Sequence, residues 1–139
     1  MLHITDNKNR IPLVLFLLRL SIFITMAMWT MDKFLRTEHA AAVFEHFYGL
    51  SGLDESLTYV LASAEAVLLI AFLIGIKPCI TYGMVLMLHS ISTLASYKQY
   101  INPFEGSNLL FFAAWPMLAA CSALYILRDF DTWRVSTCK

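Results

Sequence analysis

LTYVLASAEAVLLIAFLIGI, residues 57–76, is an apolar run with one charged side chain, that of Glu65. The hydrocarbon core of a bilayer is about 30 Å thick, and about 20 apolar residues in an α-helix cross it. Similar runs occupy residues 12–31, 79–97 and 109–127. Lipid offers no water to hydrogen-bond the backbone, and these runs do not alternate as barrel strands do. They are therefore predicted to be helices.

The composition agrees with a membrane protein. The 139 residues are 59% hydrophobic and 14% charged, whereas soluble domains are about 45–50% apolar and about 25% charged. We predict an all-α fold, in which residues 1–139 form a single membrane domain, a four-helix transmembrane bundle. The net charge is zero and no basic tract occurs, so nucleic acid is not an expected partner. The expected partners are the lipid bilayer and either other membrane subunits or further copies of the chain.

The breaks between the runs predict the element bounds. We expect spans over about residues 11–35, 56–76, 79–100 and 108–128, with Pro116 kinking the last span. A short amphipathic helix is expected over about residues 37–49, ending at Gly49. It would lie on the membrane surface or fold over the mouth of the bundle.

Basic residues near the span ends predict the orientation. Six lie on the side of the two termini, namely Lys8, Arg10, Lys77, Arg128, Arg134 and Lys139. Three lie on the other side, namely Lys33, Arg36 and Lys98. Because cytoplasmic loops carry the excess of Lys and Arg, both termini are predicted to be cytoplasmic. The expected location is a bacterial inner membrane.

The cysteines give no redox or zinc motif. Cys79, Cys121 and Cys138 are far apart in sequence, and no CxxC pair occurs. The chain therefore has neither a thiol-redox motif nor a zinc knuckle. It also has no motif for haem, flavin or iron–sulfur binding.

Arg19, Glu65 and His89 are the ionisable residues inside the predicted spans. Such residues usually face the bundle interior and have partners, because charge is costly in lipid. At ~1.5 Å of rise per residue, Arg19 is predicted ~12 Å from one membrane edge, and Glu65 and His89 ~15 Å from theirs. All three are therefore expected in one layer near the midplane, where Arg19 and Glu65 would form a pair.

The helix faces extend this layer into a polar seam. His89, Ser92 and Ser96 share a face at helical spacing. The seam is a candidate path for a small molecule or a proton. The alternatives are that the Arg19–Glu65 pair only fixes helix pairing, that His89 makes an ordinary core hydrogen bond, and that Arg19 snorkels toward water.

Two weaker clusters suggest metal binding. Met26 lies among the methionines of the first span, and thioethers together with imidazole suit Cu(I). His39 and His46, spaced by seven, share a face of the predicted surface helix beside Glu38 and Glu45. The alternatives are ordinary apolar filling for the methionines and a solvated surface for the histidines.

Residues 12–127 resemble the DoxX-like membrane proteins, the group that includes MauE and the DoxD subunit of thiosulfate:quinone oxidoreductase. The similar stretches are Arg19-Leu20-Ser21, residues 29–34 (WTMDKF) and residues 64–75 (AEAVLLIAFLIG), together with His89. The resemblance implies a four-helix membrane bundle, and relatives that work in quinone-linked complexes or as accessory or assembly factors. It also adds Asp32, the acidic residue of the second stretch, to the candidates.

Three functions follow from these observations. In the first, a quinone-linked membrane component binds a headgroup or relays a proton through Arg19, Glu65, His89, Ser92 and Asp32. A quinone is then the expected small molecule, and a partner subunit supplies the electrons. The second is a non-catalytic accessory or assembly subunit, and the third is a transporter or copper-handling protein. Whether the chain is an enzyme stays open.

Overall fold

The computed structural model describes residues 10–136 and residue 138. Its elements are helices, with no strand among the described residues: α1 (Arg10–Leu35), α2 (Thr37–Tyr48), α3 (Glu55–Ile74), α4 (Pro78–Ala95), α5 (Tyr97–Ile101), the 3₁₀ helix η2 (Asn108–Ala113), α6 (Ala114–Ile126) and the 3₁₀ helix η3 (Arg128–Phe130). The all-α prediction is confirmed.

Four helical segments are long and apolar enough to cross a bilayer: α1, α3, α4 and the continuous segment Asn108–Ile126. Their outward faces carry large apolar side chains, such as Val67 and Leu94, which are 68% and 65% exposed. Water would not stabilise so much exposed apolar surface, whereas acyl chains cover it. The chain is therefore an integral membrane protein built on a four-helix bundle.

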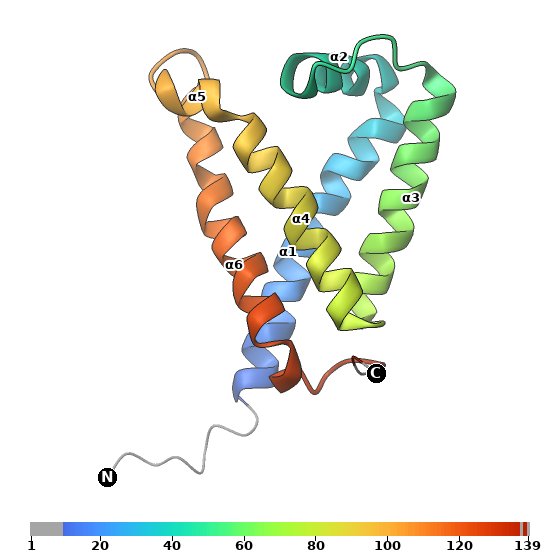
Figure 1. Ribbon diagram of the computed structural model, residues 1–139, viewed down its shortest axis with the longest axis vertical. Helices are drawn as coiled ribbons and strands as arrows, with labels where there is room; N and C mark the ends of the chain where they lie inside the picture. The colour runs from blue at the N-terminus through green and yellow to red at the C-terminus, as the bar shows by residue number, and fades with distance from the viewer. Residues whose placement is uncertain (1–9, 137, 139) are drawn as a thin grey trace.

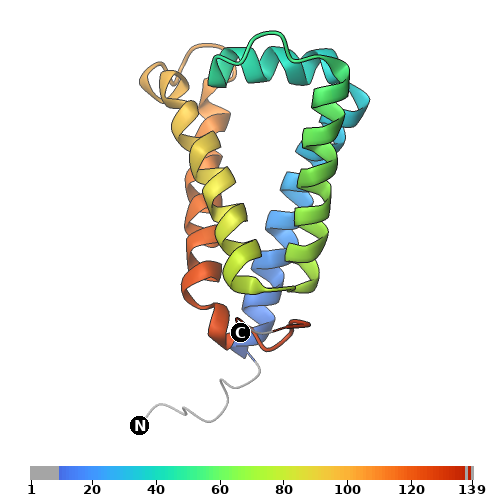
Figure 2. The ribbon, with the colours of Figure 1, turned by 45° about the vertical axis from the view of Figure 1, so that its right-hand side comes forward.

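The four spans converge at one end and separate toward the other (Figures 1 and 2). The converging end holds the start of α1, the α3–α4 turn and the C-terminal tail, and we call it the tail end. At the opposite end, α2 lies across the spans (Figure 2). This placement agrees with the surface helix predicted over residues 37–49. A core of buried side chains, including Leu15, Ile22, Leu69, Phe72 and Val85, joins α1, α3 and α4.

Local chemistry explains where the helices begin and end. The Asp54 carboxylate accepts a hydrogen bond from the Leu57 backbone N–H at 2.8 Å and caps α3. Gly49 and Gly75 end α2 and α3 in the left-handed conformation. Pro78 opens α4, where its missing N–H has no helical partner to lose.

Two predicted spans differ in detail from the structure. The third ends at Ala95, and Ser96 separates it from the short α5. The fourth begins as a 3₁₀ helix and becomes α-helical at Ala114. Pro116 cannot donate to the carbonyl four residues earlier, so the turn before it is tighter. The predicted kink is thus a change of helix type.

The described residues after α6 fold back onto the bundle. After η3, residues 131–136 run back across the tail end of the bundle and meet the α3–α4 turn (Figure 1). Asp131 in this segment is fully buried. Lys8 and Lys139, which entered the predicted orientation, lie outside the described residues.

Candidate functional site

A buried ionic network closes the tail end of the bundle. The Arg19 guanidinium on α1 donates from Nη1 to the Asp131 carboxylate at 2.9 Å and to the Tyr82 hydroxyl at 2.6 Å. The Tyr82 hydroxyl in turn donates to Oδ2 of Asp131 at 2.6 Å. Nη2 of Arg19 donates to the Trp133 carbonyl. The three residues are at most 1% exposed, so a full ion pair sits inside the protein.

The network leaves two buried atoms without a partner. Nε of Arg19 and Oδ1 of Asp131 have no hydrogen bond within the described part of the chain. Asp131 therefore binds the guanidinium through one oxygen, and that oxygen also takes the Tyr82 hydroxyl. A guanidinium can bind a carboxylate through two parallel hydrogen bonds, and Arg19 does not do so here.

Gly75 allows the tail to approach Arg19. Its φ is 73°, and a Cβ added there would lie 2.7 Å from Nη1 of Arg19 and 2.6 Å from Cβ of Arg134. Contacts this short do not occur between real side chains. The α3–α4 turn can thus rest on the guanidinium only because residue 75 has no side chain.

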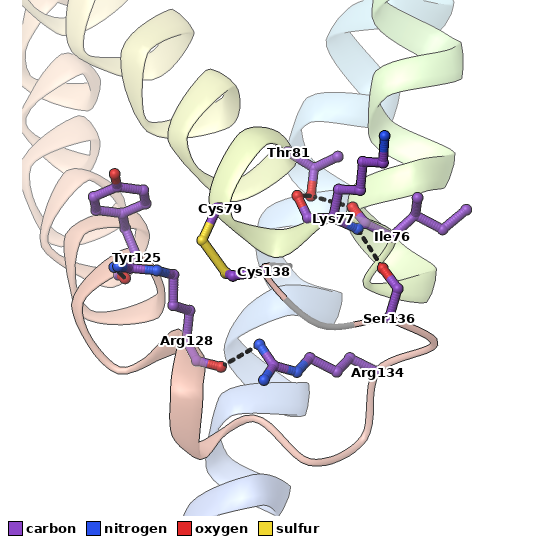
Figure 3. The surroundings of a disulfide bond; sticks show 9 residues. All are labelled: Ile76, Lys77, Cys79, Thr81, Tyr125, Arg128, Arg134, Ser136 and Cys138. Carbon is purple, nitrogen blue, oxygen red and sulfur yellow. Dashed lines mark hydrogen bonds between the residues drawn. A yellow bond between two sulfur atoms is a disulfide. The ribbon is translucent and has the colours of Figure 1, made fainter.

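The tail is fastened to the α3–α4 turn at several points. Backbone N–H groups of Val135 and Ser136 donate to the carbonyls of Ile74 and Gly75 at 3.2 and 3.3 Å. The Lys77 N–H donates to the Ser136 hydroxyl at 2.6 Å (Figure 3). A disulfide joins Cys138 to Cys79 at the start of α4 (Figure 3). Cys121 stays free and buried. We call residues 131–136 together with Cys138 the strap.

Glu65 pairs with Lys33 of α1 and not with Arg19, so the predicted Arg19–Glu65 pair is wrong. Side chains on a helix lean toward its N-terminus. Arg19 on α1 therefore leans toward the tail end, and Glu65 on the antiparallel α3 leans toward α2. Lys33 leans back toward Glu65 from the last turn of α1, and the two side chains are 20% and 15% exposed.

Asp32 belongs to a third, separate group near α2. Its carboxylate accepts hydrogen bonds from Arg36 and from Nδ1 of His39, the latter at 2.7 Å. Asp32 is 13 residues after Arg19 on α1, a rise of ~20 Å, so it does not lie in one layer with Arg19. Arg19, Glu65 and His89 thus have separate partners, and the predicted common layer stays a prediction.

His89 lies between these two ends and touches neither network in the described residues. Its ring is 1% exposed. Nε2 is 3.1 Å from the Ala114 carbonyl of α6, and Nδ1 has no partner within residues 10–136 and 138. The Trp29 indole stacks beside the ring, with centroids 6.2 Å apart and planes tilted by 22°. Ser92, half-buried, follows one turn later on α4.

The predicted metal candidates have other surroundings. Met26 is buried in the core, His39 binds Asp32, and His46 lies against Phe47 and Gln99. Among the residues that the structure describes, no group of three or more His, Cys, Asp or Glu side chains gathers as a metal site would require.

Sequence reasoning missed Asp131, Tyr82 and the cystine. Depth within the predicted spans gives Glu65 as the partner of Arg19, whereas Asp131 lies in the segment after the last span. One signal was present: Cys79 and Cys138 both fall at the tail end of the predicted topology. A CxxC motif requires two cysteines close in sequence, whereas a disulfide requires only that they are close in space.

Comparisons with protein-family models, with curated proteins and with solved structures find no match for this chain.

Proposed function

We propose that this chain is a membrane component of a redox-associated system and binds the headgroup of a quinol at His89. The buried Nδ1 atom without a partner is the observation that supports it most. A buried polar atom with nothing to bond is costly, and a ligand that supplies the missing hydrogen bond removes the cost.

The partner of Nε2 indicates which ligand Nδ1 can take. The Ala114 carbonyl only accepts hydrogen bonds, so Nε2 carries the proton. In the neutral ring, Nδ1 is then an acceptor. It complements the hydroxyl of a quinol, and not the carbonyl of a quinone. When the quinol is oxidised to the quinone, His89 would take one of its two protons and the other would be released to water. A partner protein with a redox centre would take the two electrons.

The neighbours of His89 fit a flat aromatic ligand. Trp29 presents an indole beside the imidazole and is 46% exposed, so it lies between His89 and the surrounding lipid. Thr93 donates to the His89 carbonyl at 2.7 Å. We assign Ser92 as a second polar contact on α4. A quinol entering from the bilayer would pass Trp29 and stack on it.

The test is the lipid extract of the protein purified in mild detergent. We expect quinone or quinol near one equivalent in the wild type and in His46→Ala, a histidine control exposed outside the spans. We expect a loss of at least tenfold in His89→Ala and a partial loss in Trp29→Ala. An extract without quinone, or unchanged content in His89→Ala, would contradict the proposal.

A non-catalytic accessory subunit is the second candidate. The span that contains α6 is the least covered of the four, with 11% of its most apolar window buried against 33% for α4. Ala113 and Ala119 are exposed on it, and small residues allow a neighbouring helix to come close. Isolation as a lone monomer in mild detergent would count against this function.

For the location we propose a bacterial inner membrane, as the resemblance to DoxX-like proteins implies. The orientation is less simple. Counting basic residues favours cytoplasmic termini, whereas the Cys79–Cys138 disulfide favours an oxidising compartment on that side. We give the disulfide more weight, because cytoplasmic thiols are kept reduced, and we place the tail end outside the cytoplasm.

Orientation can be measured with Cys79→Ser, which leaves Cys138 as an exposed free thiol. A membrane-impermeant maleimide added to intact spheroplasts should label it. Labelling that requires detergent permeabilisation would instead place the termini in the cytoplasm.

A further inference from the structure

We propose that Arg19 and Tyr82 form a binding site for a small carboxylate, that the strap fills this site with Asp131, and that the Cys79–Cys138 disulfide is the latch that holds it closed. The site lies at the tail end, away from His89, so this inference does not depend on quinol binding.

The group that fills the site identifies the class of ligand. A carboxylate oxygen of Asp131 takes both Nη1 of Arg19 and the Tyr82 hydroxyl. Because an unpaired buried guanidinium is strongly destabilising, Asp131 leaves the closed site most readily when another anion takes its place. A compact carboxylate matches the space and charge of the one that leaves.

The fit of Asp131 leaves room for a better ligand. Nε of Arg19 and Oδ1 of Asp131 are both buried and both without a partner in the described residues. A free carboxylate, without a backbone to constrain it, can turn to bond Nε and a terminal nitrogen together. The strap therefore does not use the full hydrogen-bonding capacity of Arg19.

A single segment of the chain, the strap, separates the Arg19 guanidinium from the surroundings of the protein. The Trp133 carbonyl bonds the guanidinium directly, yet the Trp133 and Val135 residues are 50% and 73% exposed. Beyond Asp131 and Trp133, the strap is held by the three hydrogen bonds to the α3–α4 turn, by a hydrogen bond from Nη1 of Arg134 to the Arg128 carbonyl at 2.9 Å, and by the disulfide. Lifting residues 131–136 would expose Arg19 without moving a span.

The latch opens by thiol–disulfide exchange. A dithiol reductant attacks the Cys79–Cys138 bond, and the protein gains two electrons and two protons as two thiols. The reductant leaves as a disulfide. Cys138 is exposed, so a thiolate can reach its sulfur. The reduced strap keeps its hydrogen bonds. Because the disulfide no longer holds it, a free carboxylate needs less free energy to displace Asp131 from Arg19.

Acetate is the probe, and the whole protein in detergent is the sample. We expect calorimetry to show no acetate binding to the oxidised wild type and saturable binding after reduction with dithiothreitol. The double variant Cys79→Ser/Cys138→Ser should bind without reductant, and Cys121→Ser should behave as the wild type does. Chloride at the same ionic strength should give no saturable heat.

Hydrogen exchange provides a second measurement on the same samples. Backbone amides of residues 131–136 should exchange at least tenfold faster in reduced protein with acetate than in oxidised protein, while those of α1 are unchanged. Equal exchange in both states, or acetate binding that is absent or independent of the disulfide, would overturn the proposal. If Asp131→Ala folds, acetate should raise its melting temperature more than chloride does, and an equal effect of the two salts would also count against it.

Discussion

Nη1 of Arg19 lies 2.9 Å from Oδ2 of Asp131, although the two residues are 112 positions apart in the chain. Their side chains are 2% and 0% exposed. One charge comes from the first span and the other from the segment after the last span, so the contact joins the two ends of the fold.

Removing one member of this pair should be costly. We expect Asp131→Ala to lower the free energy of unfolding by about 3–5 kcal/mol, because it leaves the Arg19 charge buried and unpaired. Asp129→Ala, which removes an exposed carboxylate two residues earlier, should change stability by less than ~0.5 kcal/mol. Unfolding in detergent, followed by circular dichroism, measures both, and equal effects of the two would contradict the pairing.

Gly75 should be far less tolerant than Gly49, although both have positive φ, 73° and 68°. Gly49→Ala meets nothing within 4 Å and should cost about 1–2 kcal/mol through backbone strain alone. Gly75→Ala adds contacts with Arg19 and Arg134 below 3 Å. Its melting temperature should therefore fall well below that of Gly49→Ala, and the two should be similar if the strap does not rest on this turn.

Lys33 and Glu65 should be energetically coupled, and Arg19 and Glu65 should not. A double-mutant cycle of Lys33→Ala with Glu65→Ala is expected to give a coupling of about 0.5–3 kcal/mol, as residues in direct contact do. The cycle of Arg19→Ala with Glu65→Ala should be additive within ~0.5 kcal/mol. The reverse result would restore the pairing first expected from the sequence.

The disulfide should stabilise the fold as well as fasten the strap. It closes a loop across a sequence separation of 59, and such cross-links typically contribute about 2–4 kcal/mol. Cys79→Ser should lose this stabilisation and become insensitive to dithiothreitol. Cys121→Ala should still be destabilised by dithiothreitol, as the wild type is, because Cys121 is not in the bond.

The fold could be predicted because the bilayer sets the length and apolarity of each helix. The apolar runs predict the spans that contain Glu65 and His89 to within a few residues, and Pro78 indicates where α4 begins. Gly49 indicates where α2 ends. The change of helix type before Pro116 could not be predicted. Proline disrupts α-helical hydrogen bonding, but its presence does not say whether a kink or a 3₁₀ turn results.

The partners of the interior charges could not be found from depth alone. The rise per residue gives the depth of a Cα atom. The charged groups of Arg19 and Lys33 lie several ångströms away from their Cα atoms, toward the N-terminus of α1. Applying that lean would have separated Arg19 from Glu65. Asp131 was missed because a polar tail without apolar periodicity gives no sign that it folds back.

The most direct test of the account is peptide mapping of unreduced protein, purified from membranes and alkylated before digestion. A strap fastened across the tail end predicts a peptide linking Cys79 to Cys138, with Cys121 alkylated once the chain is denatured. Alkylation of all three cysteines without reduction would show that the latch does not form, and would contradict the closed tail end on which the Arg19 site depends.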